Sequence, residues 1–239
     1  MNLPISEDDF HRKIVTAAKL YWRTRRTQAN RQRESGSLDA GTRGQVTGGK
    51  QLDGFANLVK EIGLLAGFKK DEIFFNTSAP IPGYYRPQKN WDVVFIRNGQ
   101  LIALVELKSQ SGSFGNNFNN RTEEVLGVSH DFWKAFRERA FGVVDPPWIG
   151  YLFFLEDNIK ARSAVSLKSS PIEPMEIFKG TSYLRRYEIL CERLVLERDY
   201  SSTALIVSDK SCRNVRDGGD NVTAYGFFKS LYSFLVSHR

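Results

Sequence analysis

The feature that most constrains the fold of this chain is a pair of apolar segments, WDVVFI and LIALVELKSQ, joined by a short connection that contains Asn98-Gly99. Asn and Gly accept the positive φ angles of a tight type I′ turn, so the pair predicts a hairpin of two antiparallel strands. Side chains alternate along a strand. We therefore expect one row of Leu101, Ala103, Val105 and Leu107, and an opposite row of Leu104, Glu106, Lys108 and Gln110.

The charges in this hairpin need an explanation, because polar groups in such apolar strands are costly unless they are paired or bind something. Pairing about the turn is expected to bring Asp92 close to Glu106. Two carboxylates and the backbone carbonyl of Leu107 are ligands suited to Mg²⁺, and Lys108 would orient or help activate an attacking water and offset phosphate charge. The alternative is an ordinary salt bridge on a solvated face.

The remaining periodicity predicts helices and strands in alternation. A first helix is expected from a cap at Ser6 through Tyr21 into an arginine-rich run, and a second over about 52–67. Beyond the hairpin we expect a helix from Thr122, then the strand WIGYLFFLE, the helix TSYLRRYEILCERLVLE, the strand STALIVSD and the helix FFKSLYSFLVSH. This order predicts an α/β fold with helices flanking a sheet, as one domain over residues 1–239.

Net charge points to a polyanionic partner. The chain carries a formal charge of +7, and seven cations stand against two anions between Tyr21 and Lys50. Together with its glycine, serine and threonine content, this predicts a basic and mobile segment at about 23–50, which is either a solvated linker or an arm that orders on a phosphate backbone. With no signal peptide and no membrane-length apolar run, we expect a soluble, cytoplasmic protein with no membrane partner.

The stretch from Ser111 to Arg121 follows the charged strand directly and is expected to form a loop. Its amide and guanidinium side chains could make bidentate contacts with base edges in the major groove of duplex DNA. The alternative is that they satisfy local backbone groups and cap the next helix. The candidates for binding DNA are Lys50, Asn116, Asn117, Asn119, Asn120 and Arg121, and two further polar residues, Glu61 beside the buried face of the second helix and Gln110, could support the site.

These motifs carry a family resemblance. Asp92 with Glu106-Leu107-Lys108 resembles the PD-(D/E)xK nuclease motif, with Trp91 in place of the usual proline. More specifically, NWDVVF, ALVELKSQ and SGSFGNNFNNRTEEVLG with the following HDFWKAFRE resemble the XhoI and PaeR7I family of type II restriction endonucleases.

The resemblance implies a restriction-endonuclease-like fold with a mixed central sheet, and a catalytic site of Asp92, Glu106 and Lys108. It also implies a homodimer that uses Mg²⁺ to cut double-stranded DNA at the palindrome CTCGAG, and a DNA methyltransferase partner that protects the host. Two alternatives stay open: a structure-selective or repair nuclease with the same motif, and a DNA-binding module whose acidic cluster is not catalytic.

Overall fold

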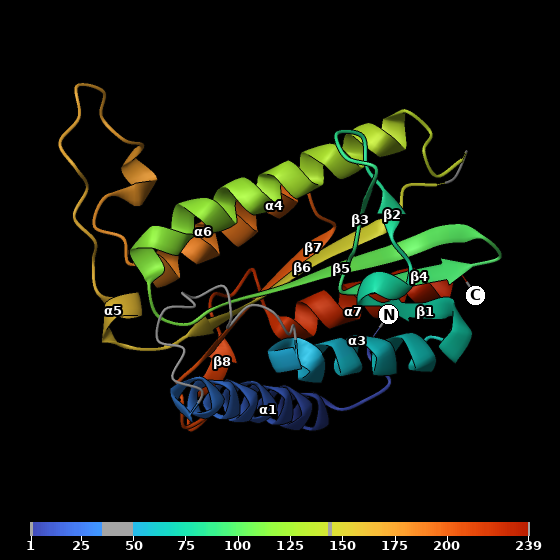
Figure 1. Ribbon diagram of the computed structural model, residues 1–239, viewed down its shortest axis with the longest axis horizontal. Helices are drawn as coiled ribbons and strands as arrows, with labels where there is room; N and C mark the ends of the chain where they lie inside the picture. Colours follow the sequence, from blue (N-terminus) through green and yellow to red (C-terminus); the bar gives the residue numbers. More distant parts are fainter. Residues whose placement is uncertain (1, 35–49, 143–144, 239) are drawn as a thin grey trace.

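A mixed six-stranded sheet forms the centre of the molecule (Figure 1). The computed structural model describes residues 2–34, 50–142 and 145–238. The strand order is β1 (Ile73–Phe75), β4 (Val93–Arg97), β5 (Gln100–Gln110), β6 (Trp148–Glu156), β7 (Ser202–Ser208) and β8 (Val215–Asp217). Strands β5, β6 and β7 run parallel, whereas β1, β4 and β8 pair antiparallel with their neighbours. The predicted α/β fold with a mixed sheet is confirmed.

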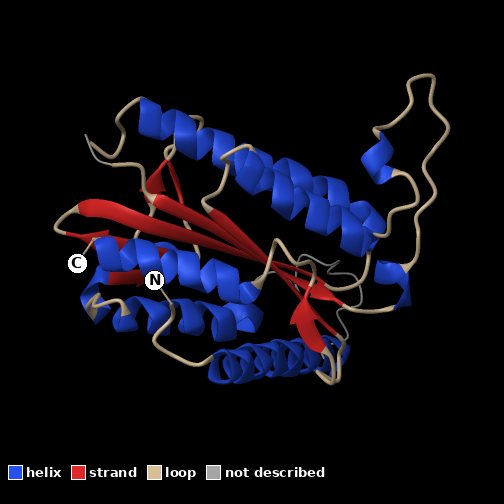
Figure 2. Ribbon diagram, turned by 180° about the vertical axis from the view of Figure 1, so that it is seen from behind, coloured by secondary structure: helices blue, strands red, loops and turns tan. Residues whose placement is uncertain are grey.

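Helices cover both faces of the sheet (Figures 1 and 2). One face packs against α1 (Glu7–Glu34), α3 (Asp53–Leu65) and α7 (Ala224–Ser237), and the other against α4 (Phe114–Arg137) and α6 (Tyr183–Leu196). Because the central strands are covered on both sides, their side chains are apolar in both directions, as in WIGYLFFLE of β6, which is buried throughout. Within the described ranges, the helices lack the length and apolarity that a membrane crossing requires.

Helix α1 begins as the sequence predicts and extends further. Asp9 donates its backbone N–H to Ser6 Oγ at 3.1 Å, which is the expected N-terminal cap. The helix continues to Glu34, so the part of the predicted mobile segment from Arg23 to Glu34 is helical, because no glycine or proline interrupts the chain before Gly36. Residues 35–49 lie outside the described residues, and mobility there stays a prediction.

The hairpin forms at Asn98 and Gly99, whose φ angles are +52° and +75°. A bulge, however, shifts its register. Phe95 pairs with Ala103 and Ile96 with Leu101, which leaves Ile102 as the extra residue. Leu101 therefore packs on the α4 side with Leu104, and its predicted place in the row of Ala103, Val105 and Leu107 is wrong.

Helix α4 begins at Phe114, so the predicted loop from Ser111 to Arg121 and the predicted helix start at Thr122 are wrong. Phe114 stacks on Tyr183 of α6 with ring centroids 6.0 Å apart, and Phe118 meets Tyr187 edge to face at 5.1 Å. These two phenylalanines, one helical turn apart, hold the asparagine-rich stretch in helical form against α6. The asparagines therefore lie on a helix that packs against α6.

The other predicted helices and strands are present, and several short elements were not predicted. Strands β6 and β7 and helices α3, α6 and α7 occupy the expected segments. The unpredicted ones are β1, β2 (Ile81–Pro82), β3 (Gln88–Lys89), β8, α5 (Ile159–Arg162), and the short helical turns η1 (Lys50–Leu52), η2 (Lys70–Glu72), η3 (Asn76–Ser78) and η4 (Glu176–Phe178). Elements this short carry no periodic pattern.

Arg97, at the end of β4, joins three separate segments. Its guanidinium donates to both oxygens of Glu72 at 2.9 and 2.7 Å, and to the carbonyl oxygens of Gly67 and His238 at 2.8 and 2.9 Å. It also lies 3.8 Å from the ring centroid of Phe68. The side chain is only 13% exposed, so these charge-assisted bonds are shielded from water.

We predict that Arg97→Met lowers the free energy of unfolding by about 2–4 kcal/mol, because it leaves a carboxylate and two carbonyl groups without their donor. Urea denaturation measures the change. Arg12→Met is the matched control, since the Arg12–Asp9 pair is exposed and solvent screens it, so its loss should change stability little. Equal losses in the two variants would contradict this account of Arg97.

Candidate active site

Strand pairing brings the two predicted carboxylates together. Val93 pairs with Val105, which places Asp92 beside Glu106 on the neighbouring strand. The backbone N–H of Leu107 donates to Asp92 Oδ2 at 2.7 Å. Trp91, which precedes the aspartate, is 2% exposed and packs edge to face on Phe132 of α4. The position of Asp92 is therefore fixed by the sheet on one side and by a buried aromatic ring on the other.

Both oxygens of Glu106 are bound to lysines. Lys108 Nζ lies 2.7 Å from Oε1, and Lys89 Nζ lies 2.6 Å from Oε2. The Glu106 side chain is 3% exposed. The sequence predicted the contribution of Lys108 but missed Lys89, which comes from β3 and has no pattern around it that would mark it as part of a site.

Helix α4 adds a third carboxylate. Lys108 Nζ lies 3.0 Å from Glu124 Oε1, and Glu124 also pairs with Arg121. Because α4 already begins at Phe114, Arg121 and Glu124 lie within the helix, and both face β5. The start of α4 at Phe114 could have been predicted from the spacing of Phe114, Phe118 and Val125, which fits one helical face.

The carboxylates of this cluster differ in their pKa. Burial, and then the nearby Glu106, raise the pKa of Asp92 to about 6. Burial alone would also raise the pKa of Glu106, but the charges of Lys108 and Lys89 outweigh it and hold that pKa below its ordinary value. The pKa of Lys108 is raised, because Glu106 and Glu124 outweigh the effect of its burial. At neutral pH, Asp92 is thus the partly buried carboxylate of the cluster whose charge is least compensated.

Asp92 and Leu107 lie at the junction of two cavities, each of about 300 Å³. One reaches toward α3 and is lined also by Asp53, Asn57 and Lys60. The other lies between α1, β5 and the start of α4, and its lining includes Tyr21, Arg25, Lys108, Asn117 and Arg121. One cation of the predicted basic segment, Arg25, therefore borders the site.

The predicted DNA-binding residues are divided between two sides of α4. Asn117 and Arg121 face the cavity beside Lys108. Asn116, Asn119 and Asn120 are exposed and line neither of these cavities. Asn117 Nδ2 donates to the carbonyl of Ser113 at 2.9 Å. This residue therefore also satisfies a local backbone group, as in the alternative interpretation of the asparagines.

Gln110 has a local partner, whereas Lys50 lies apart from the cluster. Gln110 borders the cavity near Asn117, and its Nε2 donates to the carbonyl of Gly112. Lys50, at the start of η1, is exposed and lines neither cavity.

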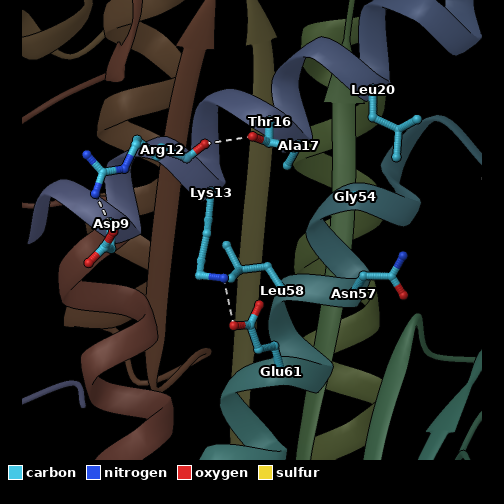
Figure 3. A pocket seen from close by; sticks show the side chains of 10 residues that line it. All are labelled: Asp9, Arg12, Lys13, Thr16, Ala17, Leu20, Gly54, Asn57, Leu58 and Glu61. Atoms are coloured by element: carbon cyan, nitrogen blue, oxygen red, sulfur yellow. Dashed lines mark hydrogen bonds and ion pairs between the residues drawn. The ribbon is translucent and has the colours of Figure 1, made fainter. Parts of the chain in front are cut away.

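Glu61 is not part of the cluster. It forms a 2.7 Å ion pair with Lys13, in the groove between α1 and α3 (Figure 3). The acidic residue that α3 directs toward Asp92 is Asp53, at the first turn of the helix. The apolar pattern does not mark Asp53, because this residue lies in the first turn of the helix, whereas Glu61 lies beside the middle of the apolar face.

The donor set fits a hard divalent cation such as Mg²⁺. Asp92 and Glu106 offer carboxylate oxygens and Leu107 a backbone carbonyl, and a cation would compensate the charge of Asp92. In the parts of the chain that the structure describes, no group of three or more His, Cys, Asp or Glu side chains is placed to hold a metal. A metal here would thus keep several waters or substrate oxygens, as Mg²⁺ usually does.

The raised pKa of Asp92 predicts a pH-dependent stability in the absence of metal. Between the ordinary pKa of 3.8 and the folded value of about 6, the folded state binds more protons than the unfolded state, so the contribution of Asp92 to stability falls as pH rises. In EDTA, the free energy of unfolding of Asp92→Asn should equal that of the wild type near pH 4 and exceed it by up to about 3 kcal/mol at pH 7. A stability difference that is constant from pH 4 to pH 7 would contradict the predicted shift.

The chain is similar to known restriction enzymes over most of its length. A family model described as restriction endonuclease XhoI matches residues 31–219, a span that contains the whole cluster. The type II restriction enzyme BstVI of Geobacillus stearothermophilus is 44% identical over 214 residues, which cover 86% of this chain and 96% of that protein.

Two further relatives match over shorter stretches. The type II restriction enzyme XhoI of Xanthomonas vasicola is 44% identical over 66% of this chain and 64% of that protein. The type II restriction enzyme AbrI of Azospirillum brasilense is 43% identical over 62% of this chain and 68% of that protein. No solved structure matches this chain.

Proposed function

The chain belongs to the XhoI family of restriction endonucleases, and we propose from this membership that it is a type II site-specific deoxyribonuclease that hydrolyses phosphodiester bonds with Asp92, Glu106 and Lys108. The observation that carries the proposal is the convergence of these side chains on adjacent strands, beside two cavities. The three similar restriction enzymes support the same reaction class.

Asp92, Glu106 and the carbonyl of Leu107 would hold Mg²⁺. When bound, Mg²⁺ lowers the pKa of a coordinated water and neutralises charge that develops on the phosphate. Glu106 and Glu124 raise the pKa of Lys108, so without metal its ammonium group stays protonated at neutral pH and acts as a cation and hydrogen-bond donor. Its two carboxylate partners hold the ammonium group in place to orient the water and offset phosphate charge.

The substrate we propose is double-stranded DNA, cut at CTCGAG. The target sequence rests on the family resemblance, of which the asparagine-rich stretch is the most specific part. Because one active site cuts one strand, cleavage of both strands of a palindrome is most simply performed by a two-fold homodimer. A DNA methyltransferase acting on the same sequence would protect host DNA, and this partner need not bind the nuclease.

Cleavage of a plasmid with a single CTCGAG site tests the proposal. We predict one linear product with Mg²⁺, and no product with Asp92→Ala or Lys108→Ala. In EDTA, Asp92→Ala should bind the site at least as tightly as the wild type, because an anion facing phosphate has been removed, whereas Lys108→Ala has lost a cation and should bind no better. Rates and dissociation constants are compared after circular dichroism confirms folding.

Several outcomes of this experiment would contradict the proposal. Normal cutting by Asp92→Ala would remove the proposed active site. A preference for branched DNA would favour a structure-selective nuclease, and binding without cutting would indicate a non-catalytic module.

The placement of Asn117 and Arg121 beside Lys108 gives a separate prediction about specificity. If they read base edges, alanine at either position should cost about 1–3 kcal/mol of discrimination at one base pair. Alanine at Asn116 or Asn120, which are exposed outside both cavities, provides the matched control, and Lys50→Ala should weaken binding to all sequences alike. Cleavage of a set of single-base variants of the site measures each change. Unaltered selectivity at both positions would place base reading elsewhere.

A further inference from the structure

Lys89 is a second ammonium group at Glu106, and the nuclease motif does not include it. Besides the 2.6 Å contact with Glu106 Oε2, its Nζ lies 3.1 Å from the carbonyl oxygen of Asn90 and 4.6 Å from the ring centroid of Trp91. The Lys89 side chain is 15% exposed. With Lys108 on Oε1, both oxygens of a carboxylate proposed to hold the metal are therefore covered by cations.

The two lysines are not held equally. Lys108 lies between Glu106 and Glu124, at 2.7 and 3.0 Å. Among the described residues, Glu106 is the only carboxylate that pairs with Lys89. A cation that approaches Glu106 can displace Lys89 at the loss of one ion pair and, if the ammonium group moves away, of its contacts with the Asn90 carbonyl and the Trp91 ring, whereas Lys108 keeps its ion pair with Glu124. Lys89 is thus the lysine that a metal would displace from Glu106.

The charges around the site explain why a displaced lysine would be useful. The ion pairs and the two cavities bring together four anions (Asp53, Asp92, Glu106 and Glu124) and five cations (Arg25, Lys60, Lys89, Lys108 and Arg121), so the anions do not outnumber the cations even without metal, although Asp92 itself has no ion pair. A divalent cation adds two positive charges in a setting of low dielectric, which is costly unless an anion enters with it. A DNA phosphate supplies that anion.

The backbone keeps Lys89 near the site even when its Nζ moves. Lys89 pairs with Ile81 in the β2–β3 hairpin. The tip of this hairpin is fixed to α4 by Asp131, whose carboxylate accepts the backbone N–H groups of Tyr84 and Tyr85 at 2.8 Å each and Nε of Arg86 at 2.7 Å. Asp131 is 4% exposed, so this attachment is buried. A freed Nζ would swing only within the reach of its own side chain.

We propose that Lys89 is an exchangeable counter-ion of Glu106: divalent metal displaces its ammonium group, which then pairs with a non-bridging oxygen of the scissile phosphate. The inference rests on the proposed nuclease function and adds a residue to it. The exchange makes metal binding and DNA binding cooperative. The phosphate compensates the positive charge that the metal adds, and the metal and the freed ammonium group compensate the negative charge of the phosphate.

Metal titration without DNA tests the exchange directly. Lys89→Met should bind Mn²⁺ roughly tenfold more tightly than the wild type in calorimetry, because no ammonium competes for Glu106 Oε2. At saturating Mg²⁺, the single-turnover cleavage rate of the same variant should fall by about tenfold or more, since the freed cation is missing at the phosphate. Lys13→Met removes a 2.7 Å lysine–glutamate pair outside the cluster and should change neither quantity.

Lys89→Arg provides a second variant that keeps the charge and should fold. A guanidinium pairs with a carboxylate through two hydrogen bonds and competes more strongly, so Mn²⁺ should bind more weakly than to the wild type. Unchanged or weaker Mn²⁺ binding in a folded Lys89→Met, or unchanged or tighter binding in Lys89→Arg, would overturn the exchange. If Asp92→Ala is nevertheless inactive, the proposed function survives and only the role of Lys89 is lost.

Discussion

The hydrogen bond from the Leu107 N–H group to Asp92 Oδ2 is the interaction on which the rest of the site depends. It fixes the first carboxylate of the cluster against the strand that carries Glu106 and Lys108. Helices cover both faces of that strand, so the charges sit where water screens them poorly. A one-residue slip between β4 and β5 would move Glu106 and Lys108 to the opposite face, and the bulge at Ile102 helps to set the register that prevents it.

Burial of this many ionisable groups is tolerated because they compensate one another. Glu106 is matched by two lysines, and Lys108 is matched by two carboxylates. Asp92 has a backbone donor but forms no ion pair with any described residue, and burial, followed by the nearby charge of Glu106, raises its pKa to about 6. The uncompensated charge of Asp92 lies between two cavities, where a divalent cation would compensate it.

Much of this architecture could be predicted from local patterns, and the exceptions have physical causes. The Asn98-Gly99 turn and the apolar runs predict the central strands, because turn chemistry and strand alternation are local properties. The start of α4 was missed because asparagine and glycine disfavour helices, whereas packing of Phe114 and Phe118 on α6 overrides that preference. Lys89 and Glu124 join the site only through tertiary contacts, and Asp53 rather than Glu61 faces Asp92 because of the orientation of α3.

We propose that a divalent cation binds between Asp92 and Glu106 and meets a DNA phosphate there. Anomalous diffraction from crystals of the protein with Mn²⁺ and a CTCGAG duplex measures this most directly. The account predicts an anomalous peak within bonding distance of both carboxylates and of a phosphate oxygen, with Lys89 no longer on Glu106. A peak elsewhere, or Glu106 still bound to both lysines in the loaded complex, would contradict it.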